Sequence, residues 1–227
     1  MLNDISRYYL MWLSLLSLSV TIMSCYNSDP IMPGRTAQNE PKCGDNGYQY
    51  QRLEGCDGQV YPDPLFSPYI IPFTNGTVFR MGLSNCSASF HAPGSPHQYA
   101  FDFDFPVGHE FIAARGGTVV KVEEGSSDNM INNGVGNYLV IDHGDGTFGW
   151  YLHSPQDGIY VESGDRVNRR DVLGVVGQTG SAGYPHLHFI VTRGENIDDF
   201  NGIPITFGGF SPMVTLLRTG SQYIVCN

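Results

Sequence analysis

Two closely spaced histidines could share one small site. His186 and His188 stand two positions apart in the segment 183–189, which reads Gly-Tyr-Pro-His-Leu-His-Phe. Side chains alternate across a β-strand, so both imidazoles would point to the same face of a strand at this position. A neutral imidazole binds metals and also works as a general base near pH 7. The pair therefore predicts a site in which one histidine binds a metal and the other works beside it.

Further candidate ligands lie upstream of this pair. Segment 99–105 reads Tyr-Ala-Phe-Asp-Phe-Asp-Phe, and its alternation places Asp102 on the face opposite the aromatic rings. His91 and His97 precede it in a loop with Gly, Pro and Ser, and His153 ends the run Trp-Tyr-Leu-His. Histidine and aspartate together suit Zn²⁺, and three protein ligands would leave the fourth position for water. A zinc ion bound in this way lowers the pKa of its water to about 7 and polarises a carbonyl.

Composition limits the classes of protein to which the chain can belong. The 227 residues are 41% hydrophobic and include 28 Gly and 14 Pro, which suits a turn-rich β protein with a real core. The formal net charge is −10. A net negative charge argues against nucleic-acid binding, because the affinity of such proteins rests on Lys and Arg side chains that neutralise phosphates. We therefore expect no nucleic-acid partner.

The chain from about residue 76 onward reads as strand after strand. Short β-rich runs are separated by turns that carry Gly, Pro, Asn or Asp, and no run after the N-terminal apolar segment has a sustained helical period. This pattern predicts an all-β domain, a sandwich or a barrel-like form. The predicted strands are 77–81, 99–105, 118–123, 138–142, 147–153, 171–176, 187–192 and 203–207.

The N-terminus reads as a targeting segment that occupies residues 1–24. Arg7 precedes an apolar run from 8 to 23, which is short for a bilayer span of about 20 residues. Ile-Met-Ser-Cys at 22–25 resembles a lipobox, so we expect a lipoprotein signal with a lipidated Cys25. An ordinary secretory signal cleaved near Ser24 is the alternative. Either reading places the mature chain outside the cytoplasm.

Residues 25–42 are predicted to be a tether, residues 43–75 a wrapping segment, and residues 76–227 the main domain. Besides Cys25, the chain holds four cysteines. An even number in an exported protein predicts two disulfides, with three possible connectivities. We favour a local Cys43–Cys56 bridge within the wrapping segment, which leaves Cys86 to pair with Cys226.

An ordered series of motifs between about residues 72 and 207 resembles the lysostaphin/LytM-type zinc metallopeptidases, which cut peptidoglycan cross-bridges. The resemblance implies a barrel-sandwich-like β domain, zinc as cofactor and peptidoglycan peptides as substrate. The matching motifs are Tyr-Ala-Phe-Asp at 99–102, Pro-Val-Gly at 106–108, Ala-Ala-Arg-Gly-Gly-Thr-Val at 113–119, Gly-Asn-Tyr-Leu-Val-Ile-Asp-His-Gly at 136–144, Tyr-Leu-His at 151–153, Gly-Asp-Arg-Val at 164–167, Leu-Gly-Val-Val-Gly-Gln-Thr-Gly at 173–180 and Pro-His-Leu-His at 185–188.

The resemblance also implies residue roles. Asp102 and His188 would be zinc ligands together with one upstream histidine. His153 and His186 would orient the attacking water, take its proton and stabilise the developing oxyanion. Membrane attachment would follow from the lipid anchor if Cys25 is lipidated.

The sequence departs from the family pattern at the first ligand. The common spacing puts that ligand four residues before the aspartate, where this chain has Gln98. His97 lies five residues before Asp102 and would face the wrong way on a regular strand. We therefore prefer His91, in the loop, with His97 as the alternative. Ile190 also replaces a frequent glutamate.

Two functions follow from this reading. The first is a zinc-dependent endopeptidase that hydrolyses peptide cross-links of peptidoglycan. The alternative is a non-catalytic LytM-like module that binds the wall or activates other wall hydrolases, because the first ligand is open and a catalytic zinc needs three protein ligands.

Overall fold

The computed structural model describes residues 58–127, 134–199, 201–208 and 217–225. Within these residues the chain forms strands and only two short 3₁₀ turns, which confirms the predicted all-β class. The turns are η1 (Pro64–Phe66) and η2 (Ser89–His91). The strands are β1 (Val78–Leu83), β2 (Phe101–Asp104), β3 (Glu110–Ile112), β4 (Gly117–Glu123), β5 (Asn137–Asp142), β6 (Thr147–Ser154), β7 (Arg166–Val167), β8 (Val172–Val175), β9 (His186–Arg193) and β10 (Gln222–Ile224).

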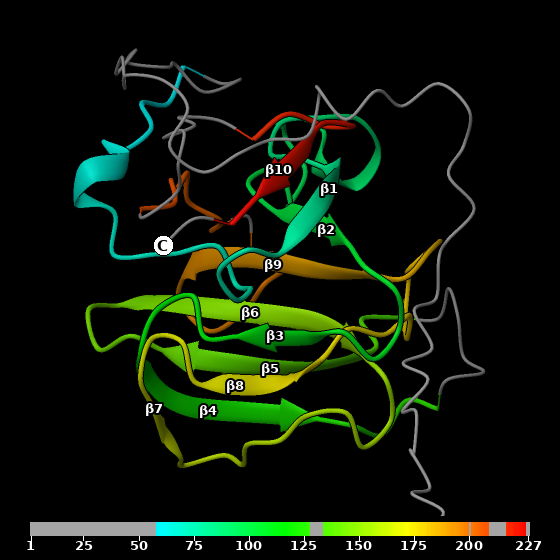
Figure 1. Ribbon diagram of the computed structural model, residues 1–227. Helices are drawn as coiled ribbons and strands as arrows, with labels where there is room; N and C mark the ends of the chain where they lie inside the picture. The colour runs from blue at the N-terminus through cyan, green and yellow to red at the C-terminus, as the bar shows by residue number, and fades with distance from the viewer. Residues whose placement is uncertain (1–57, 128–133, 200, 209–216, 226–227) are drawn as a thin grey trace, which may run out of the picture. The chain divides into compact units, whose positions relative to one another are not determined.

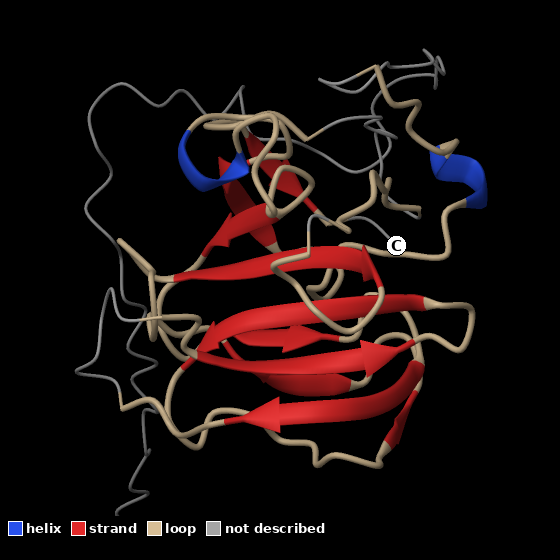
Figure 2. Cartoon of the chain, turned by 180° about the vertical axis from the view of Figure 1, so that it is seen from behind, coloured by secondary structure: helices blue, strands red, loops and turns tan. Residues whose placement is uncertain are grey.

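Eight strands form one large antiparallel sheet in the order β10-β1-β2-β9-β6-β5-β4-β7 (Figure 1). The remaining two, β3 and β8, pair with each other as a small second sheet. Figure 2 shows the large sheet from behind, with the turn η2 in blue at the upper left. The large sheet is open, because its edge strands β10 and β7 do not pair with each other. Of the two forms that the sequence predicts, a sandwich or a barrel-like domain, the fold is therefore the sandwich-like one.

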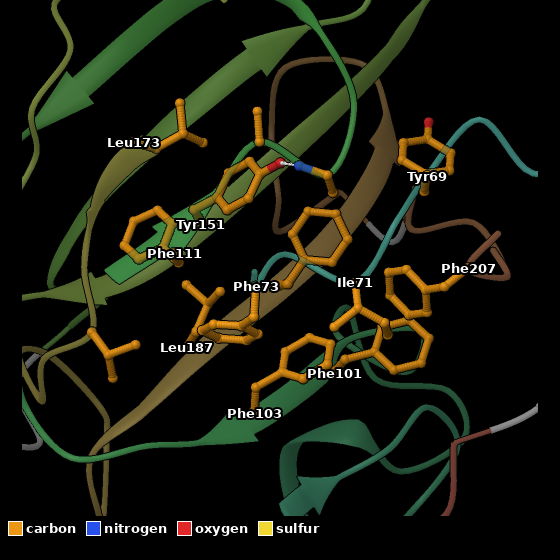
Figure 3. Close-up of a cluster of buried hydrophobic side chains, with 14 of the residues drawn as sticks. Tyr69, Ile71, Phe73, Phe101, Phe103, Phe111, Tyr151, Leu173, Leu187 and Phe207 are labelled. Carbon is orange, nitrogen blue, oxygen red and sulfur yellow. Dashed lines mark hydrogen bonds between the residues drawn. The ribbon is translucent and has the colours of Figure 1, made fainter. Parts of the chain in front are cut away.

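The main core lies between the two sheets (Figure 3). Phe111 on β3 stacks on Tyr151 of β6, with ring centroids 5.7 Å apart. The backbone N–H of Ala114 donates to the Tyr151 hydroxyl over 2.8 Å, so this buried polar atom is satisfied. Burial of each such ring removes about 150–250 Å² from water, so the aromatic rings contribute a large share of the buried apolar area. Tyr151 therefore identifies the face of β6 that packs into the main core.

A second apolar cluster covers part of the opposite face of the large sheet. Trp150 on β6 and Ile190 on β9 are both buried there. Ile190 pairs directly with Trp150 across the strands, and the indole N–H of Trp150 donates to the Thr192 hydroxyl over 2.9 Å. Since His186, His188 and Ile190 alternate along β9, the histidines share this face. An ionised glutamate at position 190 would be buried in this cluster, which explains the apolar residue.

Residues 1–57 lie outside the described residues. The predicted signal, the predicted tether, the predicted lipidation of Cys25 and the predicted Cys43–Cys56 bridge all fall within them. Cys86 is disulfide-bonded, while Cys226 is also outside the described range, so the pairing stays a prediction. The described end of the wrapping segment packs Phe73 into the main core. In the described part of the chain, no helix has the length and apolarity needed to cross a membrane.

Two glycines bring distant turns into close contact beside β5. Gly136 and Gly180 both have positive φ, of 78° and 73°. A Cβ atom on Gly180 would lie 2.4 Å from the backbone nitrogen of Gly136, which no real contact allows. The contact fixes the position of Thr179, whose hydroxyl accepts from the Asn137 N–H and donates to the Ser154 carbonyl. This segment therefore requires glycine for space as well as for backbone conformation.

We predict that Gly180→Ala destabilises the protein more than Gly144→Ala does. Gly144 has nearly the same φ, 77°, but nothing lies within 4 Å of its added Cβ. The left-handed backbone alone costs a non-glycine residue about 1–2 kcal/mol. The backbone clash at Gly180 should add about 1–3 kcal/mol. Urea unfolding of both variants measures the difference, and equal losses would show that the contact with Gly136 is not tight.

His143 has a structural environment, as its turn context suggests. Its Nδ1–H donates to the Gly116 carbonyl over 3.0 Å, and its ring packs edge-on against Tyr69 at 5.5 Å. Burial lowers the pKa of His143 below its usual value, and nearby Arg115 adds to the effect. The folded chain thus resists protonation at this position more than the unfolded chain does.

The stability of the protein should therefore fall as pH drops below about 6.5, because the unfolded chain then binds a proton that folded His143 does not. His143→Gln should lose less unfolding free energy between pH 7.5 and 5.5 than the wild type. The measurement is denaturant unfolding in EDTA at both pH values. Tyr160→Phe, at an exposed position, should keep the wild-type pH dependence, and an unchanged slope in the His143 variant would contradict the assignment.

Candidate metal centre

The site is built on the register of three neighbouring strands. Asp102 on β2 lies directly opposite His188 on β9, and Leu152 on β6 lies opposite His188 from the other side. Directly opposite residues share one face of a sheet, so Asp102 and His188 meet. The His188 Nδ1 atom is 2.8 Å from the Asp102 Oδ1 atom. The β-alternation predicted for both segments therefore brings these two residues together.

His91 reaches the same carboxylate from the turn η2 (Ser89–His91). Its ring is 1% exposed, and its Nε2 atom lies 3.2 Å from Asp102 Oδ1. Its Nδ1 atom lies 3.2 Å from the Ser84 carbonyl oxygen and donates to it, which leaves the Nε2 lone pair directed at the carboxylate. Of the two histidines considered for the first ligand, His91 is thus the one that lies against Asp102.

His186 lies next to this group on the same face of β9. Its Nε2 atom is 3.5 Å from Asp102 Oδ1. Its Nδ1–H donates to the Tyr184 carbonyl over 2.8 Å, so its Nε2 atom carries the lone pair. His186 therefore presents a proton acceptor to the site.

His153 reaches the site through a β-bulge. Asn137 pairs with Ser154 and Tyr138 pairs with Leu152, so His153 is an extra residue on β6 without an opposite partner. Its φ is +76°, an uncommon value for a residue with a side chain. Regular alternation from Tyr151 would send His153 into the main core, whereas the bulge turns it to the face of His186. The two rings are 4.8 Å apart, and the His153 Nδ1–H donates to the Thr179 carbonyl over 2.8 Å.

Burial and charge set the protonation of these groups. Burial raises the pKa of Asp102, but the neighbouring imidazoles, His188 first, outweigh this effect and hold the pKa well below its usual range. Burial lowers the pKa of His188 well below its usual value. Burial and the neighbouring His186 lower the pKa of His153 to about 3. An ionised carboxylate among neutral imidazoles is the state that metal binding requires.

Two overlapping groups have the donors for a metal ion. Each places one ligand atom per residue within 4.8 Å of the others: His91, Asp102 and His188 in one, and His153, His186 and His188 in the other. The first contains the only carboxylate of the two, and its negative charge in a buried place favours a cation there over an all-imidazole set. This donor set, two imidazoles and one carboxylate with two further imidazole nitrogens beside it, could hold a metal ion with a coordination position left open.

The site opens into a cavity of about 700 Å³. Its wall includes apolar side chains, among them Leu83, Phe90 and Leu152, together with Gly134 and Gly183. Among the described residues that line it there is no lysine or arginine, and Asp198 contributes a carboxylate. The cavity can thus hold a chain of apolar and polar groups but offers no described cation to a free carboxylate.

A group of residues next to the metal centre supports the Tyr184 edge of this cavity. Arg80 on β1 makes a 2.6 Å ion pair with Asp104, which lies opposite His186 across the strands. The Tyr184 ring packs against His186 at 4.8 Å. A Cβ atom on Gly82 would lie 2.1 Å from Asp104 Oδ1 and 2.3 Å from the Tyr184 hydroxyl, so glycine makes room for both. The β-bulge in β1 between residues 81 and 83 is visible only in the pairing of β1 with β2, so the sequence alone does not indicate it.

Known proteins resemble this chain over the segment that carries the site. Residues 96–199 match peptidase family M23. The peptidoglycan DD-endopeptidase ShyA of Vibrio cholerae is 32% identical over 105 residues, which cover 46% of this chain and 22% of that protein. An uncharacterized metalloprotease of Buchnera aphidicola is 33% identical over 97 residues, 43% of this chain and 23% of that protein. Lysostaphin of Staphylococcus simulans gives a TM-score of 0.47 at 24% identity, covering 61% of this chain and 51% of that one.

A buried His/Asp donor group on an antiparallel sheet, beside imidazoles with free nitrogens, defines a metallopeptidase type of site. Residues 96–199, a little under half of the chain, are similar in sequence to peptidase family M23, and a relative over this segment is a peptidoglycan DD-endopeptidase. The chain covers less than a quarter of the length of the two curated relatives above. His91 lies just before the matched segment, so only the structure connects it with the site.

We predict that His91→Gln weakens metal binding by more than the ~10–100-fold typical of a lost outer-shell partner, because His91 is one of the three candidate ligands. His109→Gln is the matched control, since His109 stacks on Phe105 at 4.1 Å and belongs to neither donor group. Competition with a chromophoric chelator measures zinc affinity for both. Wild-type affinity in the His91 variant would remove His91 from the ligand set.

Proposed function

We propose that this protein is a zinc-dependent endopeptidase that hydrolyses peptide cross-links of peptidoglycan. The observation that carries the proposal is the convergence of His91 and His188 on the buried Asp102 carboxylate, at 3.2 and 2.8 Å. The family match and the peptidoglycan DD-endopeptidase name of a relative support the substrate class. The donor chemistry favours zinc over Ca²⁺ or Mg²⁺, which prefer oxygen ligands.

The ligands in this proposal are His91, Asp102 and His188. When bound, Zn²⁺ supplies Lewis acidity toward the scissile carbonyl and lowers the pKa of water in the site. The chain's own part is to hold the three donors in place from β2, β9 and η2. The His91 Nδ1–H bond to the Ser84 carbonyl fixes that ring in the orientation that a ligand needs.

His153 and His186 handle the proton in this proposal. Both donate through Nδ1–H to backbone carbonyls, so both present a basic Nε2 atom to the cavity. One of them accepts the proton of the attacking water, and the resulting imidazolium stabilises negative charge and returns the proton to the leaving amine. The Nδ1–H bond of His153 to the Thr179 carbonyl leaves its Nε2 atom as the acceptor that faces the cavity.

The cavity favours an internal peptide bond over a terminal one. An enzyme that removes terminal residues needs a cation for the free carboxylate, and an arginine fork is the usual donor. The described lining of the cavity has neither Lys nor Arg. A cross-link peptide, whose backbone continues on both sides of the scissile bond, is a better match for these walls.

The proposed substrate places the protein outside the cytoplasm, in agreement with the N-terminal segment. In this proposal residues 1–24 direct export and Cys25 carries a lipid anchor. Residues 26–42 then tether the catalytic domain to the membrane within reach of the wall. Peptidoglycan peptides are the partner, and nucleic acid is not.

The non-catalytic module is the weaker alternative. Its motive in the sequence is the open choice of the first ligand, and the position of His91 against Asp102 speaks against a missing ligand. The paired nitrogen acceptors of His153 and His186 would also have no use in a binding module. Both observations favour the enzyme.

The test is muropeptide release from purified peptidoglycan sacculi by the zinc-loaded full chain, followed by mass spectrometry. His186→Ala and His153→Ala should each reduce turnover by about 10²–10⁴-fold with zinc still bound, because each removes a proton-transfer group. Asp157→Asn, in an exposed turn, should keep full activity. No release from several peptidoglycan types, together with no bound zinc, would overturn the proposal.

A further inference from the structure

Three of the histidines at the site are oriented in the same way. Each donates its Nδ1–H to a backbone carbonyl and points its Nε2 lone pair at the cavity. The histidines are His91, His153 and His186, and their acceptors are the carbonyl oxygens of Ser84, Thr179 and Tyr184 in that order. Such acceptors fix the tautomer and the ring direction of a histidine in a metal site.

His188 is oriented differently. It is its Nδ1 atom that faces Asp102 Oδ1, at 2.8 Å. Its other nitrogen, Nε2, lies 2.9 Å from the Nδ1 atom of His97. A neutral imidazole carries one proton, so a His188 ring whose Nδ1 atom binds a metal must carry that proton on Nε2. His97 is the side chain that faces it.

We propose that His97 is a positioning residue that accepts the Nε2–H of His188 and thereby keeps the His188 Nδ1 lone pair directed at the metal. The inference rests on the metal centre of the proposed function and goes beyond it. His97 does the task that backbone carbonyls do for the other three histidines. It belongs to neither of the two donor groups, so it acts through His188 and not as a ligand.

Asp198 lies beyond His97, on the solvent side. If His97 accepts at Nδ1, its own proton is on Nε2, which lies 3.9 Å from an Asp198 carboxylate oxygen. The Asp198 side chain is 70% exposed and the His97 side chain 21%, so the row of groups runs from solvent to the buried ligand. A carboxylate on this side favours the Nε2–H form of His97, although at this distance and exposure its influence is modest.

This assignment also accounts for the position of His97 in the sequence. On a regular strand, a residue five positions before Asp102 points away from it. The chain between η2 and β2 turns at 92–99 instead, and His97 packs against His188, with ring centroids 4.9 Å apart. His97 therefore lies on the side of His188 that is remote from Asp102.

The direct test reads the tautomers in the unmodified protein. The zinc-loaded full chain, labelled with ¹⁵N-histidine, is examined by long-range ¹H–¹⁵N correlation NMR. We expect His188 and His97 to carry their protons on Nε2, and His91, His153 and His186 to carry theirs on Nδ1. A His188 ring protonated on Nδ1, or a metal-bound nitrogen in His97, would overturn the inference.

Affinity measurements test the role of the hydrogen bond. His97→Leu removes the acceptor and should weaken zinc binding by about 10–100-fold. His97→Gln supplies an amide oxygen that can accept the His188 proton, so it should restore much of the affinity. Asp198→Asn should have a small effect in the same direction, and Asp199→Asn, the neighbouring control, none.

Two results would overturn the assignment without touching the proposed function. One is unchanged zinc affinity in His97→Leu. The other is a cobalt-substituted His97→Leu protein whose ligand-field spectrum shows one ligand fewer, as in His91→Gln, because His97 would then be a ligand itself. If instead the wild-type chain binds no zinc, the proposed function fails first. The metal titration of the wild type separates these cases.

Discussion

The rest of the structure depends on one buried carboxylate. Asp102 is 4% exposed, and an ionised carboxylate in such a place costs several kcal/mol unless an opposite charge compensates it. Its described neighbours are imidazoles, and those of His188 and His97 have lowered pKa values. Neutral rings offer hydrogen bonds but no full positive charge. The metal ion of the proposed function would supply that charge between the carboxylate and the ring nitrogens, and this demand would explain why so many histidines gather at one point of the sheet.

Regular strand pairing positions Asp102 and His188 at the site, whereas a β-bulge positions His153. Asp102 and His188 follow from the β2–β9 register alone. His153 does not, because only the bulge in β6 turns it toward the cavity. Its positive φ stores strain, and the surrounding contacts must hold it. They do so through Thr179, whose carbonyl accepts from His153 and whose place is fixed where Gly136 and Gly180 meet. The position of His153 thus depends mainly on backbone contacts, those of Thr179, Gly136 and Gly180.

The sequence predicts the parts of the site that obey strand periodicity. Period two was enough to place His186 with His188, and to separate Asp102 from its aromatic neighbours. The same rule fails for His153, since alternation from Tyr151 gives the wrong face and the bulge depends on pairing with a distant strand. It led us to prefer His91 over His97 but could not establish the choice, because both lie in a loop whose path depends on tertiary contacts. The carbonyl acceptors leave no mark on the sequence, since any residue has a carbonyl.

The loop before β2 explains why the first ligand is not at the common spacing. Gln98 occupies the usual ligand position, and here it braces the loop instead. Its side-chain oxygen accepts from the Gly94 N–H over 2.7 Å, and its backbone carbonyl accepts from the Cys86 N–H over 2.6 Å. With these bonds the loop closes on itself and presents His91 from η2 to the inner side of the carboxylate, while His97 reaches the outer side of His188. One loop thus supplies both a candidate ligand and the group that orients another, so a change in loop length would disturb both at once.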